Sequence, residues 1–151
     1  GGWDSLWFAD HFIPPGADHA EEALTAFEGL TAIATVAGMT KNLRLGNLVL
    51  GNTYRNPAHV AKIAATIDTL TEGRFTLAIG AGWYEREHEA YGWSFPSMKE
   101  RQDRLNRALA WCQSAGARGA WCVSPPGIHY QIGRAPRSCG GARPCPQIYP
   151  G

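Results

Sequence analysis

Short apolar runs recur along the first 111 residues and are separated by longer stretches of mixed polarity. The runs at residues 5–9, 43–50 and 75–79 are continuous enough to be buried strands, and each is followed by polar residues or glycine. The stretches between them are long enough to hold a helix. A run of this kind, repeated with helices between, predicts parallel strands joined by right-handed crossovers. We therefore expect an α/β fold.

The intervening stretches show the three- and four-residue spacing of amphipathic helices. In residues 21–37 the apolar positions are Leu24, Phe27, Leu30, Ile33 and Ala34. A second helix is predicted to begin after Asn56, a good cap, with Pro57 as its first residue, and to end at about Leu70 before Gly73. Its apolar face is expected to comprise Val60, Ile63, Ala64, Ile67 and Leu70.

Two further helices are predicted after the third strand. One is the stretch "YEREHEAYG" at 84–92, and the other runs over about 97–110. The latter is expected to expose a charged face made of Lys99, Glu100, Arg101, Asp103 and Arg104. Both doubly wound sheets and (β/α)8 barrels have this alternation, but a full barrel usually needs about 250 residues. The 151 residues of this chain could hold only part of a barrel.

The composition changes after Asp103. All 13 acidic residues lie at or before that position, whereas all four cysteines and six of the ten prolines lie beyond residue 111. We therefore expect two parts: an ordered α/β part over 1–111, and an irregular Pro/Gly/Cys-rich tail over 112–151. For residues 112–126 two interpretations stay open, a barrel insertion loop and a frame-shifted segment of a gene fragment.

Charge and hydropathy narrow the possible partners. A net charge of +1 gives no electrostatic reason to expect nucleic acid or an anionic membrane surface. No apolar run approaches the roughly 20 residues of a membrane-spanning helix, and no signal peptide is visible. The cysteine spacings fit no metal-binding template. We expect a cytoplasmic protein that acts on a small molecule and holds no metal.

Candidate chemistry lies where the predicted strands end. Asp10 and His11 follow the first strand, "GNTYRN" at 51–56 follows the second, and "GAGW" at 80–83 follows the third. Because carboxyl ends of parallel strands share one edge of the sheet, these segments should converge there. His11 could give or take a proton near neutral pH, although a strand-end histidine satisfied by Asp10 would look the same.

Glycines and an aromatic residue at the third strand end suggest a flat ligand. Gly80, Ala81 and Gly82 would let a ring approach the backbone closely, and Trp83 could stack on it. The alternative is a plain strand-to-helix turn, since the third glycine of a dinucleotide-binding fingerprint is absent. The acidic residues after this turn and His88 do not form the H-E-x-x-H metal motif, so we expect Glu85, Glu87, His88 and Glu89 to form a solvated face.

The segments "SLWFADHF", "GNTYRNPA" and "GAGWYEREHEAYG", in this order, resemble the luciferase-like monooxygenase superfamily, and more narrowly its branch of coenzyme F-420-dependent oxidoreductases. The resemblance implies a (β/α)8 TIM barrel of which only about strands two to four and their helices are present. It also implies a non-proline cis peptide within 48–51 and a catalytic His11. The cofactor-binding residues that it implies are Asp10, Leu48, Val49, Asn52, Thr53, Gly80, Ala81, Gly82 and Trp83.

Three functions follow as hypotheses. The first is hydride transfer between the deazaflavin coenzyme F-420 and an unknown organic substrate, by an enzyme that is a homodimer at full length. The second is a two-component monooxygenase that uses FMN and oxygen. The third is a non-catalytic, incomplete gene fragment. The resemblance also disfavours sugar-phosphate oxidation, because that branch carries a glutamate where this chain has Trp83.

Overall fold

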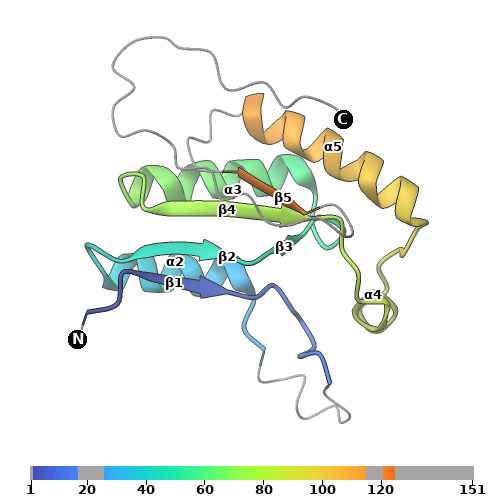
Figure 1. Ribbon diagram of the computed structural model, residues 1–151, viewed down its shortest axis with the longest axis horizontal. Helices are drawn as coiled ribbons and strands as arrows, with labels where there is room; N and C mark the ends of the chain where they lie inside the picture. Colours follow the sequence, from blue (N-terminus) through green and yellow to red (C-terminus); the bar gives the residue numbers. More distant parts are fainter. Residues whose placement is uncertain (1, 17–25, 115–120, 125–151) are drawn as a thin grey trace.

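The computed structural model describes residues 2–16, 26–114 and 121–124. Their strands and helices follow one another as a β/α chain (Figure 1). The elements are β1 (Ser5–Phe8), α2 (Gly29–Met39), β2 (Arg44–Asn47), β3 (Leu50–Gly51), α3 (Pro57–Leu70), β4 (Phe75–Gly80), α4 (Glu85–Tyr91), α5 (Met98–Ser114) and β5 (Trp121–Ser124).

All recorded strand pairs are parallel, as the alternation of strands and helices predicted. The order is β1-β2-β4-β3, with β5 also paired to β4. The strand predicted over 43–50 is divided into β2 and β3, and the Leu48–Val49 peptide bond between them is cis. The cis peptide expected within 48–51 is thus confirmed. β2 pairs with the first half of β4 and β3 with its second half, so the broken strand runs along a single neighbour.

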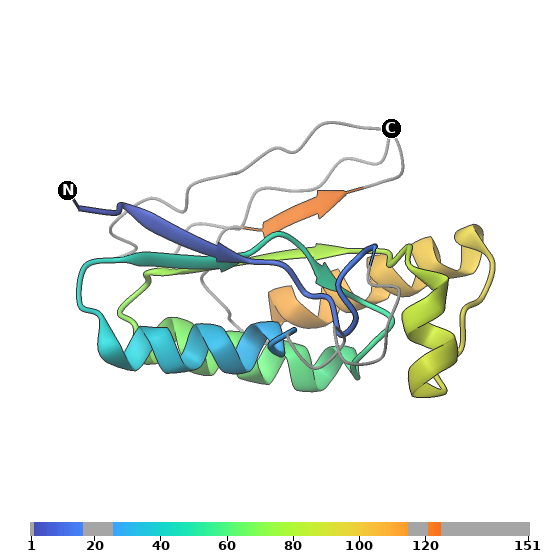
Figure 2. The same ribbon diagram turned by 90° about the horizontal axis from the view of Figure 1, so that it is seen from below.

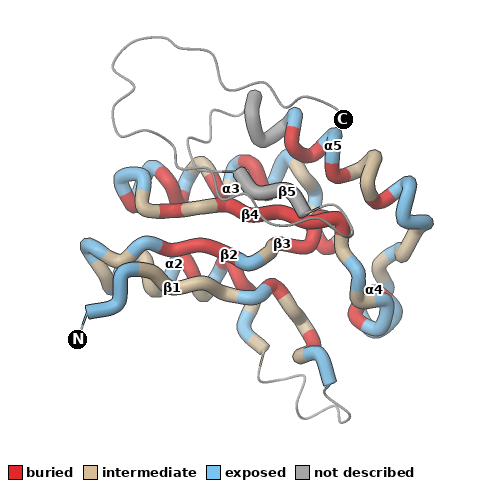
Figure 3. Tube along the Cα trace, in the orientation of Figure 1, coloured by how far each residue is buried: buried red, intermediate tan, exposed pale blue. Residues whose placement is uncertain are grey.

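Helices α2 and α3 cover the same face of this sheet, and α5 packs beside α3 (Figure 2). The core lies between the helices and the sheet, where β4 and most of β2 are buried (Figure 3). Leu45, Leu77 and Ile79 project from the strands into this layer. From the helices it receives Leu30 and Ile33 of α2, Val60, Ala64 and Ile67 of α3, and Leu105, Ala108 and Leu109 of α5. Burying these apolar side chains is the main favourable contribution to folding.

Local signals set the ends of α3. The Asn56 side chain accepts hydrogen bonds from the backbone N–H groups of Ala58 and His59, and Pro57 opens the helix as predicted. Gly73 adopts a φ of 82° just after the helix, a conformation that favours glycine. The prediction for one residue of the apolar face is wrong: Leu70, the last residue of α3, is 78% exposed.

Two helix predictions need correction. Residues 26–28 do not belong to α2, which begins at Gly29 after the Glu28 side chain caps the Thr31 N–H, and Phe27 is exposed. Residues 17–25 of the predicted helix lie outside the described part of the chain. In α5, which extends to Ser114, Arg101 is buried rather than exposed, because its guanidinium lies 4.0 Å from the centre of the Phe95 ring.

The tail contains one element that the sequence did not predict. Residues 121–124, within the segment predicted to be irregular, form β5 and pair with β4 from Leu77↔Trp121 to Gly80↔Ser124. The first three residues of the predicted tail belong to α5, and its remaining residues, 115–120 and 125–151, are outside the described part of the chain. Within the part of the chain that the structure describes, no helix has the length and apolar character to cross a membrane.

Candidate active site

A cavity of about 240 Å³ opens at the carboxyl ends of β1, β3 and β4. In Figure 1 these strand ends point toward α4, which lies beyond the edge of the sheet. The strand ends meet at one rim, as predicted for parallel strands. The lining residues are Asp10, His11, Leu48, Val49, Leu50, Gly51, Tyr54, Gly80, Ala81, Gly82, Trp83 and Met98.

His11 lines the cavity, and one of its ring nitrogens, Nδ1, contacts a carboxylate. Its Nδ1 lies 3.2 Å from both carboxylate oxygens of Glu87, a residue of α4. The ring meets Trp83 and Tyr84 edge-on, with centroids 5.7 and 5.9 Å away. The alternative in which Asp10 is the hydrogen-bond partner of the imidazole is therefore wrong. The carboxylate that contacts Nδ1 belongs to Glu87, in α4.

Asp10 instead joins the two strand ends. It is buried, and its Oδ2 accepts the Gly51 N–H at 2.8 Å. Both of its oxygens also accept from the Arg55 guanidinium at 2.7 Å, and Arg55 pairs with Glu28 as well. Burial alone would lower the pKa of Arg55, but these two carboxylates raise it above its ordinary value. Asp10 thus lines the cavity from a position that Arg55 fixes.

Glu87 is the functional candidate that the sequence did not reveal. It was expected on a solvated face, yet Glu87 is 0% exposed, as is His88, while Glu85 and Glu89 are exposed. α4 has only seven residues and places its third and fourth against the strand-end loops. A helix so short shows no clear periodicity, so no pattern in the sequence separated the buried carboxylate from the exposed ones.

The surroundings of Glu87 compensate for its burial. Its Oε1 accepts the backbone N–H groups of Phe12 at 2.6 Å and Ile13 at 2.9 Å, and its Oε2 accepts the Tyr54 hydroxyl. Burial by itself would raise the pKa of Glu87, but hydrogen bonds from His11, Ile13 and Tyr54 hold it below its usual range. The carboxylate is therefore ionised at neutral pH. Burial and the adjacent Glu87 raise the pKa of Tyr54, which stays a neutral donor.

Thr53 and Asn52 support the cavity from behind and are not among its lining residues. The Thr53 Oγ1 lies 2.7 Å from Nε2 of His88, whose Nδ1 lies 2.7 Å from the Tyr84 carbonyl oxygen. Asn52 is buried, and its N–H donates to the Gly80 carbonyl at 2.9 Å. These contacts fix the loop after β3 against the end of β4 and against α4.

The glycine loop needs its small residues. Gly82 has a φ of 83°, and a Cβ there would lie 2.5 Å from the Thr53 Oγ1. A Cβ on Gly80 would lie 3.0 Å from Val49 Cγ2. Trp83, 63% exposed, stacks on Tyr84 with a centroid separation of 5.1 Å. The loop therefore keeps its backbone open to the cavity and places an indole at its edge.

The cavity combines apolar walls with few polar groups. Leu48, Val49, Ala81 and Trp83 provide the apolar surface, and His11 provides a nitrogen that can carry a proton. Apolar walls with a few polar groups are typical of a site for a small organic molecule. Among the residues that the structure describes, no group of three or more His, Cys, Asp or Glu side chains is placed to hold a metal ion.

Comparison with known proteins finds a family model described as luciferase-like monooxygenase, which matches residues 1–131. An F420-dependent glucose-6-phosphate dehydrogenase of Amycolatopsis mediterranei is 37% identical over 109 residues, which are 72% of this chain and 32% of that protein. A 4-hydroxyprotoasukamycin monooxygenase of Streptomyces nodosus subsp. asukaensis is 38% identical over 81 residues, 54% of this chain and 20% of that protein.

Among solved structures, an F420-dependent secondary alcohol dehydrogenase in complex with an F420-acetone adduct superposes with a TM-score of 0.64. It is 29% identical, and the match covers 74% of this chain and 33% of that one. The chain spans about a third of the length of the F420-dependent dehydrogenases that it matches. The parallel sheet with its helix layer is accordingly one part of a TIM barrel.

Proposed function

Because the chain belongs to the luciferase-like monooxygenase family, we propose that its strand-end cavity holds the ring of a flavin-type cofactor in an oxidoreductase. The observation that carries this proposal is the position of His11 in the cavity. Its Nδ1 is bonded to a buried carboxylate, and the ring lines a cavity edged by the backbone of Gly80 and Gly82. The protein's substrate would then be a small organic molecule that reaches the same cavity.

The residues present fit such a ring. Leu48, Val49 and Trp83 offer apolar lining, and the glycine loop lines the cavity without side chains at Gly80 and Gly82, which suits close approach of a flat group. Asp10 would act indirectly: its ion pair with Arg55 holds the end of β1, and with it the neighbouring His11, at the cavity. Asn52 and Thr53, which the resemblance implied as cofactor-binding, would act indirectly by holding the glycine loop.

We favour coenzyme F-420 as the cofactor, with FMN as the second candidate. The names of the dehydrogenases at 36–40% identity support the first. The second stays a candidate because the family resemblance also implies an FMN-dependent monooxygenase and one relative at 38% identity is named a monooxygenase. When bound, a deazaflavin supplies a carbon that accepts or donates a hydride, and a flavin can also react with oxygen. In both cases His11 would hold or move the accompanying proton at its Nε2.

The residue after the glycine loop bears on the substrate. The family resemblance implies that the sugar-phosphate branch carries an acid or base glutamate where this chain has Trp83. An indole cannot perform that proton transfer. We therefore propose a substrate other than a sugar phosphate, although several relatives are named glucose-6-phosphate dehydrogenases.

Titration with coenzyme F-420 and, separately, with FMN tests the proposal through quenching of the cofactor fluorescence. The Trp83→Ala variant should bind the preferred cofactor about tenfold more weakly, the loss of roughly 1.4 kcal/mol expected for an aromatic contact. Trp3→Ala is the control, since the Trp3 side chain is 82% exposed and is not a lining residue. Saturable quenching by neither cofactor would contradict the proposal. Binding of FMN alone would select the second candidate.

A further inference from the structure

The buried carboxylate of Glu87 connects three segments that are far apart in the sequence: its own helix α4, the loop after β1 and the loop after β3. Its partners are the backbone of the loop after β1, the Tyr54 hydroxyl after β3, and the His11 ring at the cavity. A carboxylate with no exposed surface is costly to bury unless its oxygens are satisfied by hydrogen bonds. Here the backbone N–H groups donate to Oε1, the Tyr54 hydroxyl donates to Oε2, and His11 Nδ1 lies within reach of both oxygens.

The protonation states follow from this arrangement. An ionised carboxylate only accepts hydrogen bonds, so His11 Nδ1 must carry the proton that it shares with Glu87. In the neutral ring the other nitrogen, Nε2, is then an acceptor. The Tyr54 hydroxyl donates its own proton to Oε2 and so contacts the carboxylate, not the ring. The contact with Glu87 therefore selects the Nδ1-protonated tautomer of the neutral ring.

From these contacts we infer that Glu87 is a positioning residue, which holds His11 with Nδ1 protonated and Nε2 free for proton transfer, and that Tyr54 holds Glu87 in place. The inference rests on the proposed function in one respect, the role of His11 as the group that moves a proton. When Nε2 takes a proton from a bound molecule, the Nδ1 proton stays, and the positive imidazolium lies beside the negative carboxylate.

The substitution Glu87→Gln tests the tautomer directly. The amide oxygen must take the Oε1 position, because the N–H groups of Phe12 and Ile13 both donate there. The amide oxygen at the Oε1 position also lies 3.2 Å from His11 Nδ1, but its two lone pairs are taken by the Phe12 and Ile13 N–H groups. The amide nitrogen replaces Oε2, likewise 3.2 Å from Nδ1, and donates to it. We expect the neutral ring to change from predominantly Nδ1-protonated to predominantly Nε2-protonated.

Long-range ¹H–¹⁵N spectra of the histidine rings report each tautomer, and a His11→Asn sample assigns the His11 signals among the five histidines. Tyr54→Phe should keep the Nδ1-protonated form, because the carboxylate remains. Glu89→Gln, an exposed glutamate of the same helix, should leave the spectrum unchanged. An Nε2-protonated His11 in the unsubstituted chain would overturn the inference without any variant, as would an unchanged tautomer in Glu87→Gln.

Addition of coenzyme F-420 to the same sample separates this inference from the proposed function. A shift of the His11 Nε2 signal that saturates with the cofactor is expected if the ring lies at the cavity. An unmoved Nε2 signal would contradict the proposed function, while the tautomer in the absence of cofactor still decides the role of Glu87.

Discussion

Arg55 and Asp10 form a bidentate ion pair across 45 residues of sequence, with each carboxylate oxygen 2.7 Å from a different guanidinium nitrogen. Asp10 is buried and immediately precedes His11 in the chain. The pair therefore fixes the point at which the chain leaves β1 and enters the cavity rim. The Gly51 N–H on the same carboxylate extends this connection to the end of β3.

Arg55→Met should destabilise the fold by about 3–5 kcal/mol, because it leaves a buried carboxylate without its positive partner. Urea unfolding followed by circular dichroism measures the change. Arg104→Met is the control: it breaks an exposed pair with Glu100 on α5 and should cost less than about 0.5 kcal/mol. Equal losses of unfolding free energy in the two variants would show that the buried Asp10–Arg55 pair stabilises the fold no more than an exposed pair does.

Gly82→Ala and Gly73→Ala form a matched pair, since both glycines have φ values near 82°. Each alanine should cost about 1–2 kcal/mol for the left-handed conformation. Only at Gly82 does the new Cβ meet another atom, the Thr53 Oγ1, while at Gly73 the space is open. We expect Gly82→Ala to be the less stable variant in urea and to weaken cofactor binding. Cofactor binding that is equal in both variants would argue against the glycine loop as part of the site.

Acid should unfold the chain partly through Glu87. Hydrogen bonds hold the pKa of Glu87 below its usual range despite its burial, so folding favours its ionised form. That stabilisation is fully present above the unfolded-state pKa of about 4.3, and it is lost as pH falls from there through the folded-state pKa. Urea unfolding at pH values between about 5 and 3 should show a smaller loss of stability for Glu87→Gln than for Glu89→Gln. The same slope in both variants would refute this account.

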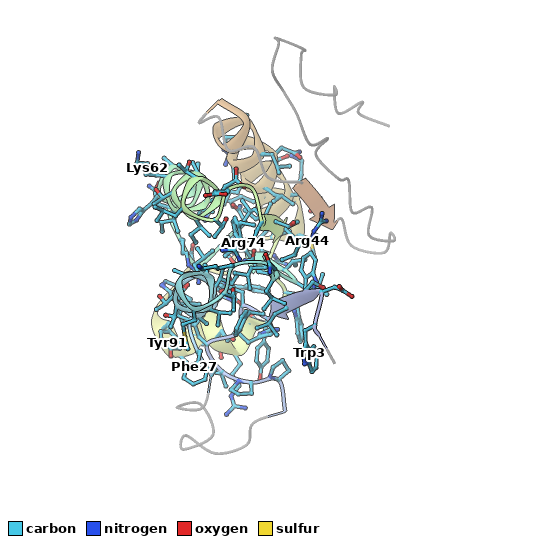
Figure 4. The ribbon with its side chains drawn as sticks, turned by 90° about the vertical axis from the view of Figure 1, so that its left-hand side faces the viewer. Trp3, Phe27, Arg44, Lys62, Arg74 and Tyr91 are labelled. Carbon is cyan, nitrogen blue, oxygen red and sulfur yellow. The ribbon has the colours of Figure 1, made fainter. Side chains whose placement is uncertain are left out.

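Arg74 ties the opposite end of the sheet and should matter for stability alone. With Arg44 it lies at the amino ends of the strands, which face the viewer in Figure 4. Its guanidinium donates to the carbonyl oxygens of Leu43 at 2.8 Å, Thr40 at 2.9 Å and Ala37 at 3.2 Å. Arg74→Met should cost about 1–3 kcal/mol by leaving these acceptors unpaired, with cofactor affinity unchanged. A loss of cofactor affinity in Arg74→Met, beside the loss of stability, would mean that the two ends of the sheet are coupled.

The limits of prediction differ between elements for physical reasons. The helix after Asn56 was predicted with correct bounds, because its cap, first-turn proline and closing glycine act through neighbouring residues. Leu70 and Phe27 were assigned to apolar faces on spacing alone, although the first is at a helix end and the second precedes α2. β5 was missed because a four-residue strand within a Gly/Pro-rich segment shows little pattern of its own.

Local sequence patterns predicted the alternation of strands and helices, the shared rim at the strand ends and the presence of His11 there. These follow from local periodicity and from the geometry of parallel strands. Which carboxylate pairs with which partner could be read only from the tertiary structure. Asp10, adjacent to His11, pairs with Arg55, whereas Glu87, from α4, bonds to His11. Hydrogen bonds select partners by distance in space, and a separation of 76 residues leaves no trace in a local pattern.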